Sequence, residues 1–164
     1  MKEKKVKPKI PVTPQKAMSK AEAYCAYQER SQQEVRDKLY SWGLHQHEVE
    51  FILSQLISTG FLAEERFAIS FAGGKFRIKK WGRTKIKMAL KAKQVSEPLI
   101  RKALSEINER DYQKTLEEII KAQGEKSNEK NSFKRNHKIA TYAIGKGFEP
   151  ELVWEILNDR SESD

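Results

Sequence analysis

The chain repeats one helical pattern three times, at intervals of 51 and then 53 residues. Apolar residues at positions i, i+3, i+4 and i+7 mark one face of an amphipathic helix. This face is Val49, Ile52, Leu53 and Leu56 in the first copy, Ile100, Ala103, Leu104 and Ile107 in the second, and Val153, Ile156 and Leu157 in the third. The helix before each face repeats with the same offsets, as Val35 and Leu39, Ile86 and Leu90, and Ile139 and Ala143. Internal periodicity of this length predicts a tandem-repeat architecture.

Capping residues agree with this spacing. Ser31 and Glu34 have the spacing of a capping box, and Gly43 and Gly147 stand where left-handed C-terminal caps would end their helices. A third periodic segment precedes each helix pair, at 17–28, 62–79 and 110–122, and "GEKSNEKNS" (124–132) indicates a longer loop before the last pair. Strand patterns are absent. We therefore expect an all-α fold of three tandem three-helix repeats forming an elongated array.

The repeats are expected at 17–60, 61–108 and 109–160, with a basic N-terminal arm at 1–16 and a tail at 161–164. Pro8, Pro11 and Pro14 argue against a regular helix in the arm, which we expect to be flexible. The chain has neither a secretory signal pattern nor an apolar run of about 20 residues, and its single cysteine, Cys25, cannot form an internal disulfide. These features predict a cytoplasmic protein without membrane contact.

Positive charge is concentrated in the middle of the chain. Arg66–Ser96 contains ten Lys or Arg and no Asp or Glu, within a chain of net charge +9. Such a segment predicts a polyanionic or acidic partner, although a solvated lysine face is an equal alternative. Arg83, Lys87 and Lys91 are spaced i, i+4, i+8 and would share one helix face. The candidate binding residues are Lys75, Arg77, Lys79, Lys80, Arg83, Lys85, Lys87, Lys91 and Lys93.

Residue patterns of common catalytic and metal sites are absent. The three histidines, His45, His47 and His137, lack partners at metal-ligand spacing, and Gly74-Lys75 lacks the other residues of a phosphate-binding loop. Cys25 lies on an apolar helix face, as a core residue would. We therefore expect no enzymatic activity, no metal and no cofactor.

The three tryptophans raise the question of base stacking. Trp42 and Trp154 lie on or near apolar helix faces, where core packing is the better interpretation. Trp81 lies between Lys80 and Arg83, and the sequence leaves packing and ligand contact equally open for it.

Three segments, "RSQQEVRDKLYSWGL", "VEFILSQLISTGFLAEERFAISFAGGKF" and "WGRTKIKMALKAKQVSEPLIRKAL", resemble the RecX family of bacterial recombination regulators. The resemblance covers most of residues 20–107. Its signatures are Arg30-Ser31 with Lys38-Leu39 and Gly43, then Gly60-Phe61-Leu62 with Glu65-Arg66-Phe67-Ala68, then Gly82-Arg83 with Ile86 and Leu90. Gln94-Val95 departs from the Gly-Ile that is usual at that place.

The resemblance implies a monomeric, three-repeat regulator that binds the RecA–DNA filament and inhibits strand exchange, ATP hydrolysis and co-protease activity. Single- or double-stranded DNA would then be a direct or indirect partner. Two alternatives stay open at this point. One is a non-enzymatic DNA-binding protein whose helix-turn-helix-like units contact phosphates, and the other is a protein-binding scaffold with a solvated basic face.

Overall fold

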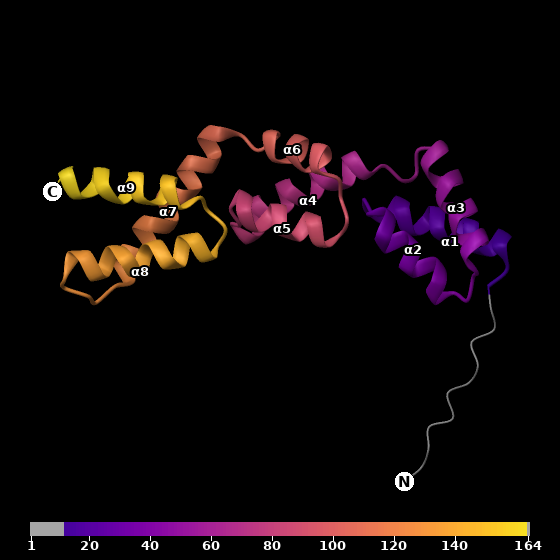
Figure 1. Ribbon diagram of the computed structural model, residues 1–164, viewed down its shortest axis with the longest axis horizontal. Helices are drawn as coiled ribbons and strands as arrows, with labels where there is room; N and C mark the ends of the chain where they lie inside the picture. Colours follow the sequence, from indigo (N-terminus) through magenta and orange to yellow (C-terminus); the bar gives the residue numbers. More distant parts are fainter. Residues whose placement is uncertain (1–11, 164) are drawn as a thin grey trace, which may run out of the picture. The chain divides into compact units, whose positions relative to one another are not determined.

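The computed structural model describes residues 12–163, and every regular element in that range is an α-helix (Figure 1). This confirms the predicted all-α class. The helices are α1 (Pro14–Tyr27), α2 (Gln32–Ser41), α3 (Gln46–Ser58), α4 (Glu64–Lys79), α5 (Arg83–Ala92), α6 (Glu97–Ser105), α7 (Glu109–Lys126), α8 (Ser132–Gly145) and α9 (Pro150–Ser163).

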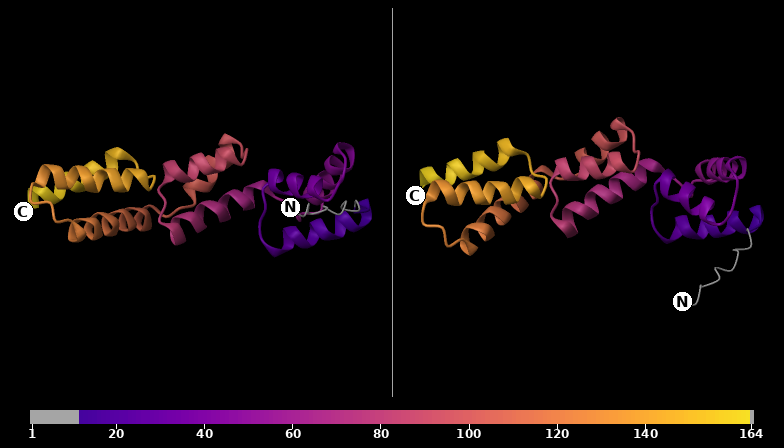
Figure 2. Two further views of the ribbon diagram at one scale, coloured as in Figure 1. Left: turned by 90° about the horizontal axis from the view of Figure 1, so that it is seen from below. Right: turned by 60° about the horizontal axis from the view of Figure 1, so that its bottom comes forward.

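The described residues divide into two compact units, and the division falls between Phe67 and Ala68 inside α4. In the first unit, α1 packs against α2 and α3, which also pack against each other. In the second unit, α5 packs against α6, and α7, α8 and α9 pack against one another. Figure 2 shows α7, α8 and α9 side by side in two further views.

The apolar faces predicted from the repeat form the cores of these units. Val49, Ile52, Leu53 and Leu56 of α3 are at most 3% exposed. Their counterparts in α6, in the turn after it and in α9 are also buried, except that Leu104 and Ile156 are half-buried. The paired positions in α2, α5 and α8 are all buried, namely Val35, Leu39, Ile86, Leu90, Ile139 and Ala143. Burial of these apolar side chains is the main source of stability.

The predicted helix caps are confirmed in detail. Ser31 and Glu34 form a reciprocal capping box at the start of α2. Gly43 and Gly147 follow α2 and α8 with φ of +86° and +102°, the left-handed conformation that glycine adopts without steric cost. Gln94 occupies the equivalent position after α5 with φ of +61°. A residue with a side chain therefore fills a place that favours glycine.

The helix ends differ from prediction in three places. Helix α1 begins at Pro14, inside the expected arm, because proline is tolerated at the first helical position, where its missing N–H has no partner to lose. Residues 1–11 of the arm lie outside the described residues. Helix α7 continues to Lys126, which shortens the expected loop, and α9 continues to Ser163, inside the expected tail.

Candidate nucleic-acid interface

The predicted basic residues lie on α4, on α5 and on the turns that follow them, all in the second unit. Helix α4 carries Lys75, Arg77 and Lys79, the turn carries Lys80, α5 carries Arg83, Lys85, Lys87 and Lys91, and Lys93 caps α5. Arg77, Lys79, Lys80 and Lys91 are exposed, whereas the other five are half-buried. The structure therefore separates them into groups with different surroundings.

The first group surrounds Trp81. The ammonium nitrogens of Lys75 and Lys85 lie 4.9 and 4.6 Å from the centroid of its ring, within range of cation–π attraction. The ammonium nitrogen of Lys75 also lies 5.4 Å from the ring centroid of Phe71, and that of Lys93 lies 5.8 Å from the same centroid. We name these five residues the Trp81 cluster. Trp81 itself is half-buried, so it packs against lysine side chains while part of its ring remains exposed.

The turn between α4 and α5 holds this cluster in place. Lys80 takes a left-handed conformation, with φ of +57°, and its N–H donates to the carbonyl of Phe76 (3.1 Å), which ends α4. The N–H of Trp81 donates to the carbonyl of Lys75 (3.2 Å). The Lys146 ammonium donates to the carbonyl of Lys79 (2.8 Å), which adds a further positive charge beside the turn.

Arg83 belongs to a different environment. Its side chain is only 20% exposed, and its guanidinium forms ion pairs with Glu149 (2.8 Å) and with Glu109. The guanidinium carbon lies 3.8 Å from the ring centroid of Tyr112. Burial lowers the Arg83 pKa, but the two carboxylates more than offset this and the net pKa is raised.

Arg83 has the spacing that places it on one helix face with Lys87 and Lys91, but its guanidinium is paired with carboxylates and does not extend into solvent beside them. Arg83 is the first residue of α5, and side chains of a helix lean toward its N-terminus. Its guanidinium consequently lies against α7 and the turn before α9 instead of facing solvent.

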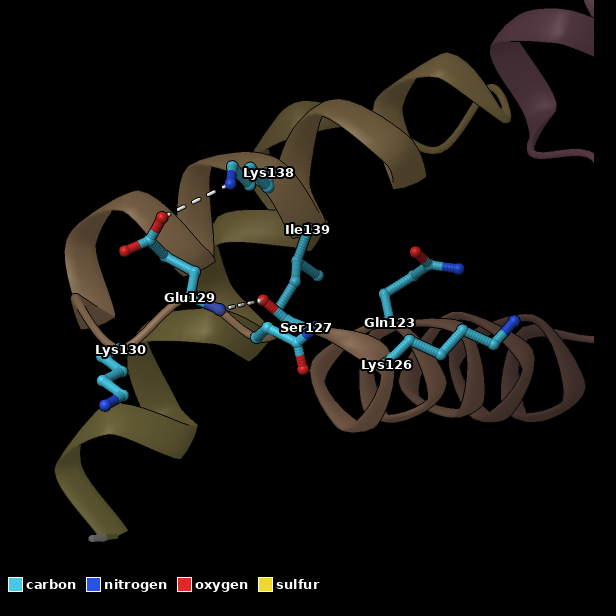
Figure 3. Close-up of a pocket in the computed structure, with 8 residues that line it drawn as sticks. Gln123, Lys126, Ser127, Glu129, Lys130, Lys138 and Ile139 are labelled. Atoms are coloured by element: carbon cyan, nitrogen blue, oxygen red, sulfur yellow. Dashed lines mark hydrogen bonds and ion pairs between the residues drawn. The ribbon is translucent and has the colours of Figure 1, made fainter.

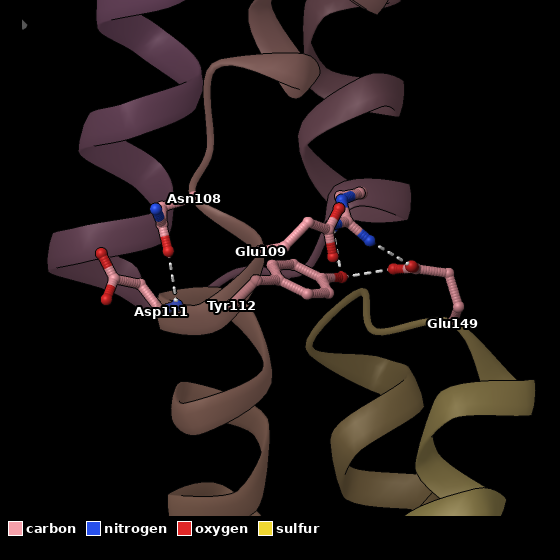
Figure 4. Close-up of polar contacts among 6 residues, drawn as sticks. Asn108, Glu109, Asp111, Tyr112 and Glu149 are labelled. Carbon is pink, nitrogen blue, oxygen red and sulfur yellow. Dashed lines mark hydrogen bonds and ion pairs between the residues drawn. The ribbon is translucent and has the colours of Figure 1, made fainter.

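Tyr112 is a structural residue that the sequence interpretation missed. Its ring is buried, its hydroxyl donates to Glu149, and it accepts the backbone N–H of Arg83 (3.1 Å). Figure 4 shows Glu109, Tyr112 and Glu149 converging there. Burial and the contact with Glu149 raise the pKa of the Tyr112 hydroxyl. The i, i+4, i+8 spacing of Tyr112, Leu116 and Ile120 is the signal that could have placed it in the core.

Lys87 and Lys91 share one acidic neighbour, Glu97. The Glu97 carboxylate lies 3.9 Å from the Lys87 nitrogen and 3.2 Å from that of Lys91. The hydrogen bond from Lys91 holds the pKa of Glu97 below its ordinary value. Glu97 is the first residue after the segment Arg66–Ser96, which contains no Asp or Glu. The charge of that segment alone therefore does not show that Lys87 and Lys91 are partly neutralised.

Other residues considered for chemistry have structural surroundings. Cys25 is buried in the first unit, and burial raises the pKa of its thiol. Trp42 packs against the core of that unit, and Trp154 contacts His137. Over residues 12–163, no three His, Cys, Asp or Glu side chains gather as a metal site would require. No helix in that range is long and apolar enough to cross a membrane.

Comparison with known proteins places the chain in a family. Residues 17–56 match the family model for the first three-helix domain of RecX, and residues 64–104 match the one for the second. The Regulatory protein RecX of Thermotoga petrophila is 31% identical over 133 residues, covering 80% of this chain and 76% of the relative. That of Prosthecochloris aestuarii is 25% identical over 146 residues, covering 88% and 93%.

A solved structure shares the fold. The crystal structure of RecX from Lactobacillus salivarius superimposes with a TM-score of 0.81 at 21% identity, covering 89% of this chain and 95% of the other. With the two domain matches and the 31% identity to a relative over most of both chains, this chain belongs to the RecX family of regulatory proteins.

Proposed function

We propose that this chain, acting as a monomer and without catalysis, binds the filament that RecA forms on DNA. It mainly inhibits the strand exchange, ATP hydrolysis and co-protease activity of that filament. Family membership supports a regulatory role, and the observation that carries the proposal is the gathering of lysines around Trp81.

The chemistry of the Trp81 cluster suits a nucleoprotein surface. Lys75 and Lys85 present ammonium groups on either side of one turn, and Lys79 and Lys80 are exposed beside them. Ammonium groups attract phosphates regardless of base sequence, which suits a filament assembled on arbitrary DNA. Lys87 and Lys91 contribute less because Glu97 lies next to both. Arg83 acts as a structural residue.

A second candidate function is direct binding of DNA through phosphates, without RecA. It is favoured by the lysine-rich character of α5, because readers of base sequence rely on Arg, Asn and Gln at the base edges. The two candidates differ in what they need: the first requires the recombinase for high affinity, whereas the second does not.

The test is DNA-dependent ATP hydrolysis by the cognate RecA, titrated with this chain. The wild type should inhibit hydrolysis, and the double variant Lys75→Glu, Lys85→Glu should require a much higher concentration for the same effect. The matched control is Lys114→Glu with Lys121→Glu, which changes the net charge equally on exposed positions of α7. Circular dichroism should confirm that both variants are folded.

Three outcomes would decide between the possibilities. Absence of inhibition by the wild type would refute the regulatory proposal for this RecA. Equal inhibition by both double variants would show that the Trp81 cluster is not the contact surface. Binding to bare DNA as tight as binding to the filament would favour the second candidate function.

A further inference from the structure

A second basic surface lies on α8 and is separate in sequence from the Trp81 cluster. Residues 130–148 contain five Lys or Arg and no Asp or Glu. Helix α8 lies inside this range and has no acidic residue. The basic residues are Lys130, Lys134, Arg135, Lys138 and Lys146.

Three aromatic rings contact one another in a row beside α8, with tilted and edge-on geometry. The ring centroids of Phe133 and His137 lie 4.4 Å apart. The ring centroids of His137 and of Trp154 on α9 lie 4.9 Å apart. Phe133 is 71% exposed, His137 is exposed, and Trp154 is half-buried. The Phe133 ring is therefore accessible to a ligand from solvent.

The basic and aromatic residues form two neighbouring rows. Phe133 and His137 are four residues apart in α8, and so are Lys134 and Lys138. Each pair therefore lies on one strip of the helix surface, with its two residues about 6 Å apart along the helix axis. The core side of α8 is occupied by other residues, namely Ile139, Ala140 and Ala143. Both rows are therefore accessible from solvent.

An open pocket continues the basic row beyond the start of α8 (Figure 3). It lies at the turn between α7 and α8 and is lined by Lys126, Lys130 and Lys138. Its one acidic residue, Glu129, accepts the backbone N–H of Asn131 (3.3 Å) and the ammonium of Lys138 (3.4 Å). The pocket thus keeps a net positive charge.

We infer that this α8 surface, made of Phe133, His137, Trp154, Lys130, Lys134 and Lys138, binds single-stranded nucleic acid. Bases would stack on the aromatic row, and phosphates would contact the lysine row. Aromatic rings beside a positively charged track are the features by which proteins bind single strands without sequence preference. A protein partner fits less well because lysine is depleted in protein interfaces. This site goes beyond the proposed function, since it lies on α8 and α9, apart in sequence from the Trp81 cluster, and adds base stacking to phosphate contact.

The experiment measures binding of the full chain to a fluorescein-labelled oligothymidylate of 20 nucleotides by fluorescence anisotropy. Phe133→Ala should weaken binding by about 5-fold or more, as expected for loss of one stacking partner. The matched control is Phe51→Ala on α3, which removes a ring that is 62% exposed from a helix without lysine or arginine. That variant should bind as the wild type does.

Salt dependence separates stacking from charge. Lys134→Gln should make the slope of log K against log salt shallower by about 0.7, the value for one phosphate contact on a single strand. Phe133→Ala should lower the affinity and leave that slope unchanged, because the ring carries no charge. Binding to a duplex of the same length should be insensitive to Phe133→Ala, since paired bases cannot stack on the ring.

The inference fails if Phe133→Ala binds the oligonucleotide as tightly as Phe51→Ala, or if single strand and duplex lose affinity equally. It also fails if Phe133→Ala weakens binding to DNA-free RecA but not to the oligonucleotide, because the surface would then be a protein contact. The oligonucleotide assay contains no RecA, so its failure leaves the proposed function standing, and the ATP hydrolysis test is equally independent of it.

Discussion

Gly82 and Gly147 meet backbone to backbone, so that a Cβ atom on Gly82 would lie 2.3 Å from the carbonyl carbon of Gly147. The N–H of Gly82 donates to the carbonyl of Lys146 (2.8 Å), and the N–H of Thr84 donates to that of Gly147 (3.0 Å). These bonds join the turn before α5 to the turn after α8. Only a residue without a side chain allows this approach at position 82.

We expect Gly82→Ala to lower the free energy of unfolding by about 1–3 kcal/mol, the usual cost of overpacking. The control is Gly74→Ala within α4, where an added Cβ meets no atom within 4 Å. That variant should be more stable by about 0.5–1 kcal/mol, because alanine favours helix more than glycine does. Urea unfolding of the three proteins measures both effects. Equal stability of Gly82→Ala and the wild type would contradict the close approach.

Gln94→Gly should stabilise the chain by about 1 kcal/mol, because the left-handed conformation of Gln94 costs about 1–2 kcal/mol for a residue with a side chain. The melting temperature should rise by about 2–4 °C. Gln94→Ala serves as the control, since alanine has the same Cβ and should give no such increase. A Gln94→Gly variant that melts no higher than Gln94→Ala would refute the strain.

Arg83→Ala should lower the free energy of unfolding by about 2–3 kcal/mol, because it leaves the Glu149 carboxylate without its ion-pair partner and removes the guanidinium that lies over the Tyr112 ring. Arg83→Lys should recover only part of this loss, since lysine cannot bridge two carboxylates with a planar fork. Arg101→Ala, at an exposed position on α6, should change stability by no more than about 0.5 kcal/mol. Urea unfolding distinguishes the cases, and an effect of Arg83→Ala as small as that of Arg101→Ala would show that Arg83 has no structural role.

Glu97→Gln should increase affinity for DNA, because Lys87 and Lys91 would no longer face a carboxylate. The salt slope on duplex DNA should become steeper, by about 0.9 for each further phosphate that these lysines neutralise. Glu106→Gln removes the same charge at an exposed position at the end of α6 and provides the control. Anisotropy measured at several salt concentrations tests this, and equal behaviour of the two variants would mean that Lys87 and Lys91 do not contact DNA.

Lys91→Gln should raise the pKa of Glu97 toward its ordinary value of about 4.3, because the hydrogen bond from Lys91 is the main cause of the lowering. Since the folded-state pKa is lowered, the associated stabilisation is present above the ordinary carboxyl pKa and is lost as the pH falls through the lowered value. Carboxyl carbon NMR titration measures the shift. Lys121→Gln on α7 should leave this titration unchanged, and a similar shift in both variants would indicate a general charge effect.

Local features of the fold were predictable because they depend on residues close together in the sequence. The side-chain period places Val49 and Leu53 on one face regardless of what packs there, and the capping box of Ser31 and Glu34 closes over three residues. The start of α1 was missed because Pro14 was interpreted as a helix breaker. Thr13 followed by Pro14 is instead the pattern of an N-cap residue before a first-turn proline, and the Thr13 side chain accepts the N–H of Lys16.

The candidate site was predictable only in part. Charge counting identified the segment that contains Lys75, Lys85 and Trp81, because net charge is a property of composition. It did not reveal Glu97 beside Lys91, or the α8 surface, since each depends on which side chains fold next to one another.

The sequence alone determined the helical class, the buried faces, the left-handed caps at Gly43 and Gly147 and the location of the positive charge, since these follow from periodicity, local residue type and composition. Tertiary structure decided the role of Arg83, which pairs with a carboxylate 66 residues away, and the need for glycine at position 82. The physical reason is distance along the chain. Hydrogen bonds and steric contacts act over a few ångströms in space, and only the packing of α5, α7 and the turn before α9 brings those groups together.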